Sequence, residues 1–541
     1  MPVPLQTMHS FVVAFLFVLS VLSTAIQAHP STSTPDSTSN TLLSSCLLSK
    51  GIKNFSYRSN SSTSPFNQLL TFSIQNLRYS LPSTPKPAII IFPLSKYQLQ
   101  QAILCLEQRS LTIRVRSGGH SYEGLSYTTS YHIPFGLIDL SNLNQVRVDP
   151  ASATAWVESG ATLGKIYYNV VVKSNGTLGF TAGSCATVGS GGHISGGGFG
   201  LLSRKYGLAA DNILDLIFID PNGRILNRSM MDEDVFWALR GGGGGSWGVV
   251  YAWKLQLILV PNRVTWFTIS HAGPIEPLAN LVHKWQFVAP NLPNEFYLST
   301  TISGSKDGNG SVSFTGLYLG SKGSAFSILS DRYPELMISE SNLEEMSWID
   351  SVVQAAGLNS VSDLRNRSTN SKNFFKAKSD YVQTPISKEG LIGAMKILTK
   401  EPSGFIICDP YGGAMARIGG RDSPFPHRAG NLFSIQYLID WIKAEEGMAD
   451  RYIAWLRDFY AYMGSFVSNN PRAAYVNYLD LDLGTNNWTV GTRSTVNDVD
   501  HARLWGDAYF LWNYDRLVRA KTKIDPENVF NNEQSIPPLP K

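Results

Sequence analysis

The sequence has few charged residues and no long stripe of one sign. Only 16% of its 541 residues are Asp, Glu, Lys or Arg, against about 25% in an average soluble domain, and the formal net charge is +4. Binding nucleic acid requires clustered Lys and Arg side chains that neutralise a row of phosphates. No stretch of this sequence has such a cluster, so nucleic acid is not an expected partner. Hydrophobic residues make up 43%, which excludes disorder as the main state. The length predicts two large domains, or three to four of about 150 residues.

Runs of 18 or more apolar residues are also missing, so no stable membrane insertion is expected. The 12-residue apolar run at 11–22 is followed by Ser23, Thr24 and Ala28, and it predicts a secretory signal over residues 1–28. No Lys or Arg precedes the run, and a buried strand is the alternative. We expect a secreted-pathway protein whose final site is the vacuole, a vesicle derived from the endoplasmic reticulum, or the apoplast. Seven glycosylation sequons agree with that compartment: Asn54, Asn60, Asn175, Asn227, Asn309, Asn366 and Asn487.

Cysteine is scarce, with four residues in the chain, and four cysteines allow three pairings. Cys46 lies in an apolar stretch, and Cys105 lies in a run of helical periodicity at 97–108. A bridge between these two would pin a loose N-terminal segment to the first domain. Cys408 is expected to be a buried strand thiol, whereas Cys185 stands between glycines.

The arrangement of short apolar runs predicts two mixed α and β lobes with a boundary near Val260 and Pro261. Residues 88–259 alternate β-branched runs with Gly-rich turns, and residues 264–474 hold a second alternating set. Helices are expected within the second set at 344–356 and 449–462, and a helix at 500–521 is expected in the last segment.

Glycine is concentrated in three loops, which we call the first (residues 116–121), second (183–200) and third (240–248) glycine loops. None has the Lys of a phosphate-binding P-loop, and none opens a helix in a βαβ unit, so a P-loop NTPase and a classical Rossmann enzyme are disfavoured. Three such loops indicate a long ligand that contains a diphosphate. The alternative is that they are hairpin tips that bind nothing.

Two side chains in these loops are nucleophiles placed where such a ligand would lie, namely His120 and Cys185. The alternative for His120, taken alone, is a structural role as a packed or hydrogen-bonded histidine. Cys185 and His193 are eight residues apart with no second pair of ligands, so no metal site is expected.

Several longer motifs together resemble the plant berberine bridge enzyme-like FAD-linked oxidase family, whose members have the vanillyl-alcohol oxidase fold. They run in order along the mature chain: RSGGHSYEGLSY (116–127), AGSCATVGSGGHISGGGFG (182–200), YGLAADNIL (206–214), DEDVFWALRGGGGGSWGVV (232–250), PYGG (410–413), YVNYLDLDLG (475–484) and NEQSIPPLP (532–540). The resemblance implies an α+β, two-lobe fold. Residues 29–260, with a PCMH-type core at about 84–259, would form the FAD lobe, residues 261–474 a substrate lobe with an antiparallel sheet and helices, and residues 475–541 would return to the FAD lobe.

The same resemblance implies FAD bound covalently at two points, with His120 on the flavin 8α-methyl carbon and Cys185 on C6. It also implies a disulfide between Cys46 and Cys105. Ala186 stands where the family usually has Pro, which we expect to loosen that loop slightly. Val188 matches a position that governs oxygen access, and Val there resembles the oxidases. The remaining cofactor contacts are expected from Arg116, Ser117, Gly118, Gly119, Ser121, Thr187, Gly189, Gly192, His193, Gly196, Gly197, Val249 and Asn477.

For catalysis, Tyr478 matches the tyrosine that acts as base in some members, and Gln436 occupies the place of a catalytic Glu in others. Tyr122 matches a pocket tyrosine, and Asp409 matches a pocket-facing position. Two further positions, Ser434 and Phe199, lack the Lys and Tyr of members that oxidise monolignols. A slot for a flat aromatic ligand is expected between Phe199, Val476, Tyr122 and Tyr478. Tyr478 needs help to ionise, from Asp409 or from the positive environment of the linked flavin; a structural turn residue is the alternative for Asp409.

The resulting hypothesis is an FAD-dependent oxidase of a plant specialised metabolite, an alkaloid or a phenolic. It would move a hydride to flavin N5 and reoxidise the flavin with O2 to give H2O2. Its partners would be a small aromatic substrate and O2, and the chain would be a monomer. The alternatives are a pericyclase in which FAD is architectural, a storage or allergen-like glycoprotein, and a carbohydrate or monolignol oxidase.

Overall fold

The computed structural model describes residues 37–59, 61, 64–131, 133–368, 372–486, 488 and 496–540. The predicted signal and the sequons Asn60 and Asn487 lie outside these ranges. The chain divides into two units, Met1–Ser45 and Cys46–Lys541. Helix α1 (Ser37–Ser49) begins before that division, and every described strand lies in the second unit.

The first part of the second unit is built on two sheets. A four-stranded sheet has the order β1 (Phe55–Tyr57), β2 (Ile89–Ile91), β4 (Phe135–Asp139), β3 (Thr112–Arg116), with β2 and β3 parallel to β4. Ile89–Ile91 is fully buried, as expected of parallel strands covered on both faces. Helix α3 (Lys96–Glu107), capped by Ser95, packs against this sheet, and α2 (Pro65–Thr71) packs against β1.

The second sheet is antiparallel, in the order β5 (Val146–Asp149), β6 (Thr154–Glu158), β10 (Val249–Gln256), β8 (Ile213–Ile219), β9 (Ile225–Leu226). A further pair joins β7 (Leu178–Gly179) to β11 (Ile258–Leu259). The helices in this region are α4 (Leu163–Lys173), α5 (Ser190–Ser195), α6 (Ser203–Tyr206) and α7 (Glu233–Leu239). The first glycine loop begins at the end of β3, the second contains α5, and the third joins α7 to β10.

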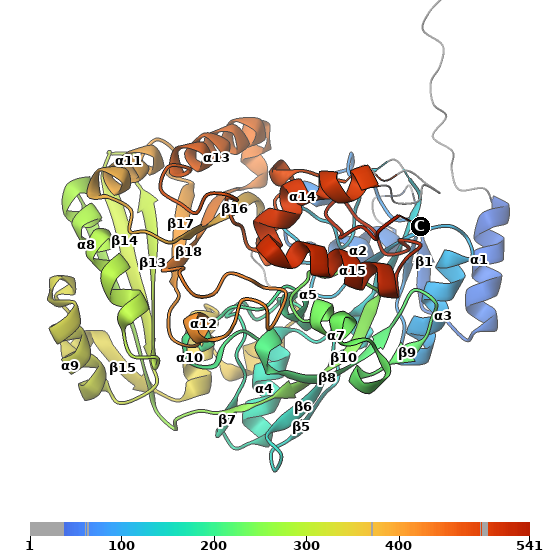
Figure 1. The fold of residues 1–541 in the computed structure, drawn as a ribbon, viewed down its shortest axis with the longest axis horizontal. Coiled ribbons are helices and arrows are strands. Elements are labelled where there is room, and N and C mark those ends of the chain that lie inside the picture. The colour runs from blue at the N-terminus through green and yellow to red at the C-terminus, as the bar shows by residue number, and fades with distance from the viewer. Residues whose placement is uncertain are drawn as a thin grey trace, which may run out of the picture. The chain divides into compact units, whose positions relative to one another are not determined.

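The central part is a seven-stranded antiparallel sheet whose apolar face is covered by α8 (Ile275–Val288), α11 (Lys388–Leu398) and α13 (Ala449–Met463) (Figure 1). Its order is β15 (Leu343–Met346), β12 (Val264–Gly273), β14 (Gly310–Tyr318), β13 (Phe296–Gly304), β17 (Gly404–Pro410), β18 (Phe433–Trp441), β16 (Phe374–Val382). Phe433 and Ile435 belong to the core under the helices, so the period of two places Ser434 and Gln436 on the opposite face. The remaining helices here are α9 (Lys322–Arg332), α10 (Trp348–Ala355) and α12 (Ala414–Arg417).

The last segment returns to the first part of the unit. Helix α14 (Val496–Phe510) packs against α15 (Tyr514–Ile524), and α15 lies beside α7 in Figure 1 and packs against it. The buried ammonium of Lys521 donates to the backbone oxygen of Ser246 at 2.5 Å and to Asp525 at 2.7 Å. The C-terminal helix therefore holds the third glycine loop in place.

The cysteines are placed as expected. Cys46 and Cys105 form a disulfide, which confirms the predicted pair. Cys408 is a buried thiol in β17 and Cys185 is free and exposed. Within the described ranges, no helix is long and apolar enough to cross a membrane.

Two local predictions differ from the structure, and one strand was not predicted. Residues 344–356 are not one helix, because Leu343–Met346 pairs with β12 and the Ser347 side chain then caps α10. Residues 500–521 form two helices, separated where Leu511 has a φ of 46°. Strand β16 was not predicted, because it contains the charged residues Lys376, Lys378 and Asp380, and charged residues are usually exposed. In the structure, all three side chains are buried.

Candidate active site

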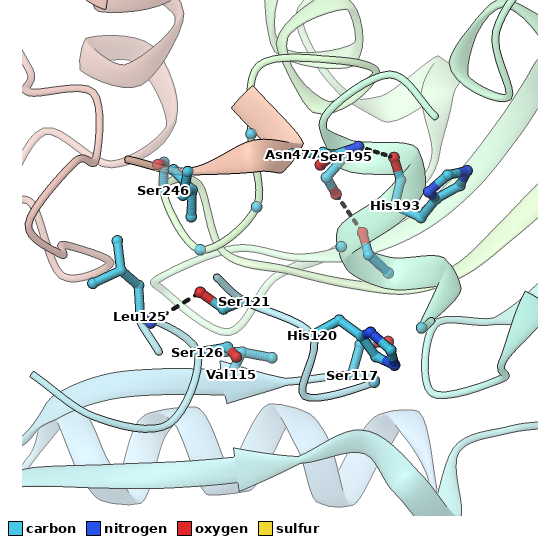
Figure 2. Close-up of a pocket in the computed structure, with 18 of the residues that line it drawn as sticks. Val115, Ser117, His120, Ser121, Leu125, Ser126, His193, Ser195, Ser246 and Asn477 are labelled. Carbon is cyan, nitrogen blue, oxygen red and sulfur yellow. Dashed lines mark hydrogen bonds between the residues drawn. The ribbon is translucent and has the colours of Figure 1, made fainter. Parts of the chain in front are cut away.

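A cavity of about 360 Å³ lies between the three glycine loops and the C-terminal segment. Figure 2 shows the first glycine loop, with Ser117, His120 and Ser121, across this cavity from the helix that carries His193 and Ser195. Most of the predicted cofactor residues line it: Ser117, Gly118, Gly119, His120, Ser121, Cys185, Val188, Gly189, Gly192, His193, Val249 and Asn477. These predicted residues therefore lie together around one cavity.

The backbone of the glycine loops fits a diphosphate-containing cofactor. A Cβ atom on Gly192 would meet nothing within 4 Å, and one on Gly244 would meet only the Ser195 Cβ at 3.7 Å and the Gly192 Cα at 3.9 Å. Side chains at these positions would therefore fill the cavity. The main-chain N–H groups of residues 118–121 and 244–246 donate to no acceptor among the described residues, and such rows of free N–H groups hold phosphate oxygens.

Four predicted cofactor residues support the wall rather than line it. Arg116 is buried, with its Nε 2.6 Å from Asp139 Oδ2. Gly196 and Gly197 lie behind the lining, and a Cβ on Gly196 would come within 2.1 Å of Asn477 Oδ1. Thr187 is buried beside the two nucleophiles.

The two predicted attachment residues lie at the same end of the cavity. Thr187 Oγ1 is 2.9 Å from His120 Nε2 and 3.8 Å from Cys185 Sγ. Burial, together with the charges of Arg367 and Lys372, lowers the pKa of His120 to about 4. At neutral pH, His120 is therefore an uncharged imidazole, and Cys185 is a free, exposed cysteine. The uncharged imidazole suits a nitrogen nucleophile, and the exposed position of Cys185 makes its sulfur accessible.

A chain of hydrogen bonds holds the second glycine loop to the C-terminal segment. The Asn477 amide donates to the His193 backbone oxygen at 3.0 Å and to the Tyr475 hydroxyl at 2.9 Å. The Gly198 N–H donates to the same hydroxyl at 2.9 Å. His193 Nε2 accepts from the Gly183 N–H at 3.0 Å, and burial lowers the pKa of His193 to about 4.

The predicted catalytic tyrosines meet at one side of the cavity. The rings of Tyr122 and Tyr478 stack nearly parallel with centroids 5.3 Å apart, and both residues line the cavity. The Gln436 amide donates to the Tyr122 hydroxyl oxygen, and Phe375 packs edge-on against Tyr122 at 5.2 Å. The first glycine loop, the central sheet and the C-terminal segment each supply one part of this cluster.

The electrostatics of this cluster oppose ionisation of both phenols. Burial and the charge of Cys185 raise the pKa of Tyr122, although the hydrogen bond from Gln436 lowers it. Burial, followed by the charges of Tyr122 and Asp409, raises the pKa of Tyr478 well above its ordinary value. Burial also raises the pKa of Asp409, to about 6, and its carboxylate accepts a hydrogen bond from the Tyr297 hydroxyl. Asp409 and Gln436 stand behind the cavity and do not line it.

The predicted aromatic slot is only partly present. Phe199 does not line the cavity, because its ring stacks on Tyr411 at 5.3 Å. Tyr122 and Tyr478 stack on each other, so no flat ligand fits between these two rings. Ser434 is paired across the sheet with Asp409.

Buried ion pairs lie behind the two tyrosines and join three parts of the chain. The Lys376 ammonium contacts Glu123 and lies 2.8 Å from Asp480, and Lys378 lies 2.6 Å from Asp480. Glu123 directly follows Tyr122, and Asp480 is two residues after Tyr478. These pairs hold both tyrosine segments against β16.

Some lining residues were not predicted one by one. Gly242–Gly245 belong to the third glycine loop, whose clustering was the available signal. Leu125, Ser126, Asn532 and Gln534 lie in the motifs at 116–127 and 532–540, whereas Ser159 lies in none of the quoted motifs. Within the described part of the chain, no group of three His, Cys, Asp or Glu could hold a metal ion.

Comparisons with known proteins agree with this geometry. A family model described as FAD binding domain matches residues 87–229, and one described as Berberine and berberine like matches residues 474–537. Berberine bridge enzyme-like D-2 of Nicotiana tabacum is 50% identical over 544 residues, which cover 97% of this chain and 95% of the relative. Reticuline oxidase of Papaver somniferum is 48% identical over 502 residues, which cover 92% and 93%.

Among solved structures, berberine bridge enzyme from Eschscholzia californica superposes with a TM-score of 0.89 at 48% identity, covering 92% of this chain and 99% of that one. This match confirms the predicted α+β, two-lobe fold, and the FAD binding domain confirms the expected cofactor. The chain belongs to the berberine bridge enzyme-like family of FAD-linked oxidoreductases.

Proposed function

We propose that this protein is a secretory-pathway oxidase that takes a hydride from a plant specialised metabolite, an alkaloid or a phenolic, and uses O2 as the acceptor. The observation that carries the proposal is that Tyr122 and Tyr478 line the same cavity as His120 and Cys185. FAD bound in this cavity would supply a hydride acceptor at N5 and would pass the electrons to O2, which would give H2O2. The relative named reticuline oxidase supports an aromatic amine as the substrate class.

FAD is held covalently at two points in this proposal, by His120 on the 8α-methyl carbon and by Cys185 on C6. Three features support it: His120 is uncharged, Cys185 is free and exposed, and both line the cavity. Val188 also lines the cavity, and its small side chain suits access by O2.

Tyr478 is the proposed base. Its hydroxyl has no hydrogen-bond partner among the described residues, so it is available to a substrate. Because its pKa is raised, little of it is ionised at neutral pH, and we expect flavin reduction to accelerate as pH rises. The charge of Asp409 raises that pKa rather than lowering it, so Asp409 does not help Tyr478 to ionise. We assign the group that helps Tyr478 to ionise instead to the positive environment of the covalently linked FAD.

The secretory route is supported by the sequons that the structure describes. Asn54, Asn175 and Asn366 are exposed, and Asn227 and Asn309 are half-buried, so none is closed to a glycan by burial.

The experiment is to mix holoenzyme anaerobically with (S)-reticuline and with a panel of phenols, monolignols and oligosaccharides. We expect an aromatic substrate to bleach the flavin and stoichiometric H2O2 to appear when air is admitted. Tyr478→Phe is the matched control, because it keeps the ring and removes only the hydroxyl. Turnover without bleaching or O2 consumption would instead identify a non-redox pericyclase, and bleaching by oligosaccharides alone would identify a carbohydrate oxidase.

A further inference from the structure

The side chain of Thr187 lies between the two predicted attachment residues. Its Oγ1 is 2.9 Å from His120 Nε2 and 3.8 Å from Cys185 Sγ, and Thr187 is only 2% exposed. It does not line the cavity, so cofactor contact is not its evident role. One hydroxyl thus links the nitrogen nucleophile to the sulfur nucleophile.

The backbone around Thr187 is held on both sides. The N–H groups of Leu163 and Gly164, at the start of α4, donate to the backbone oxygens of Val188 and Ala186, each at 2.9 Å. The Val188 N–H closes a turn onto the Cys185 oxygen at 3.2 Å. The hydroxyl is therefore fixed in position relative to both nucleophiles.

The contact also distinguishes the two nitrogens of His120. Nε2 is engaged by Thr187, which leaves Nδ1 as the nitrogen available to form a bond. A hydroxyl has one proton to donate and can accept another at the same time. It can therefore accept from the Cys185 thiol while it donates to His120 Nε2, or pass a proton in the opposite direction.

We propose that Thr187 is a positioning residue for the covalent attachment of FAD: its hydroxyl holds His120 so that Nδ1 bonds the flavin, and relays the thiol proton of Cys185 to Nε2 so that sulfur reacts as a thiolate. The inference rests on the two-point attachment in the proposed function. The two roles follow one another: His120 with its hydrogen on Nε2 bonds through Nδ1 and loses that hydrogen, and the bare Nε2 can then accept the thiol proton through Thr187.

The chemistry balances with the acceptor already proposed. At each point a C–H hydrogen of the flavin is replaced by a C–N or C–S bond. That hydrogen and the hydrogen of the nucleophile leave with two electrons, and O2 takes them as H2O2. On His120 the hydrogen that leaves is the one on Nε2, next to Thr187 Oγ1. On Cys185 it is the thiol hydrogen, whose sulfur lies 3.8 Å from the same oxygen.

The test compares Thr187→Val, which removes the hydroxyl and keeps the shape, with Thr187→Ser, which keeps the hydroxyl. Each holoprotein is digested, and the peptides containing residues 120 and 185 are weighed with and without flavin. We expect the flavin-bearing fraction at Cys185 to fall at least fivefold in Thr187→Val and to stay within about twofold of wild type in Thr187→Ser. Non-covalent FAD that remains with Thr187→Val shows that the cavity is intact, and Thr187→Ala serves if Thr187→Val does not fold.

A second arm uses His120→Ala, in which the relay has lost its acceptor. Residual attachment at Cys185 should then be unaffected by adding Thr187→Val, because both changes break the same path. Full attachment in Thr187→Val, or an equal loss in Thr187→Ser, would overturn the role of the hydroxyl while leaving the proposed function intact. Unmodified peptides from the wild type would overturn both.

Discussion

The cofactor side and the substrate side of the cavity are built in different ways. The cofactor side consists of contiguous loops whose backbone does the binding, with free N–H groups and glycines that leave room. The substrate side is a cluster of side chains from distant segments, in which Tyr122, Gln436 and Tyr478 meet across more than 300 residues of sequence.

This difference explains where chemistry can vary within such a fold. Backbone binding tolerates few substitutions, because a Cβ atom at Gly118 would lie 2.2 Å from the Gly189 nitrogen. The substrate cluster depends on individual side chains, so one change in β18 or in the C-terminal segment can alter the reaction without disturbing the cofactor.

The largest expected effect is on the covalent tethers. We predict that His120→Ala and Cys185→Ala each retain flavin through the other residue, and that the double variant retains none after acid precipitation. The readout is the flavin absorbance of the pellet and of the supernatant. Acid-stable flavin in the double variant would show that another residue forms a bond.

The next effect tests the backbone cradle. Gly192→Val should lower the flavin-to-protein ratio at least tenfold, because its side chain enters space that the cofactor requires. Gly323→Val is the matched control, since a Cβ there also meets nothing within 4 Å but lies in α9 of the central part. Equal flavin content in the two variants would place the cofactor elsewhere.

On the substrate side, Tyr478→Phe should slow anaerobic flavin reduction by about 100-fold or more, the usual contribution of a general base. Its covalent flavin should equal that of the wild type, because no tether is touched. Rapid-mixing absorbance measures the rate. An unchanged rate would transfer the role of base to Tyr122 or to a group outside this cluster.

The smallest effect is on stability. Asp409 has a pKa of about 6 in the folded protein and about 3.9 when unfolded, so the folded state holds the proton more tightly. The contribution of protonated Asp409 to the free energy of unfolding is fully present below about pH 4 and is lost as pH rises to about 6. Asp409→Asn removes this dependence, so its Tm minus the wild-type Tm should increase between pH 4 and 6 and then level off. A constant difference would mean that the pKa of Asp409 is not raised.

More of the cofactor side than of the substrate side could be predicted from the sequence. The glycine loops, which contain His120 and Cys185, are continuous stretches of sequence, so they could be recognised locally. Most strands could be predicted from apolar runs. Strand β16 was missed because its buried Lys376 and Lys378 are neutralised by Asp480, which lies over 100 residues away. The position of Phe199 against Tyr411 and the contact between Gln436 and Tyr122 likewise depend on how distant segments pack, which local periodicity does not encode.

The central claim is that one flavin is bonded to both His120 and Cys185 at the edge of the cavity that holds Tyr478. Its most direct test is the mass of the proteolytic peptides from the wild-type protein. We predict one species in which the peptides containing His120 and Cys185 are joined through a single FAD. Separate unmodified peptides, with free FAD in the supernatant, would contradict it.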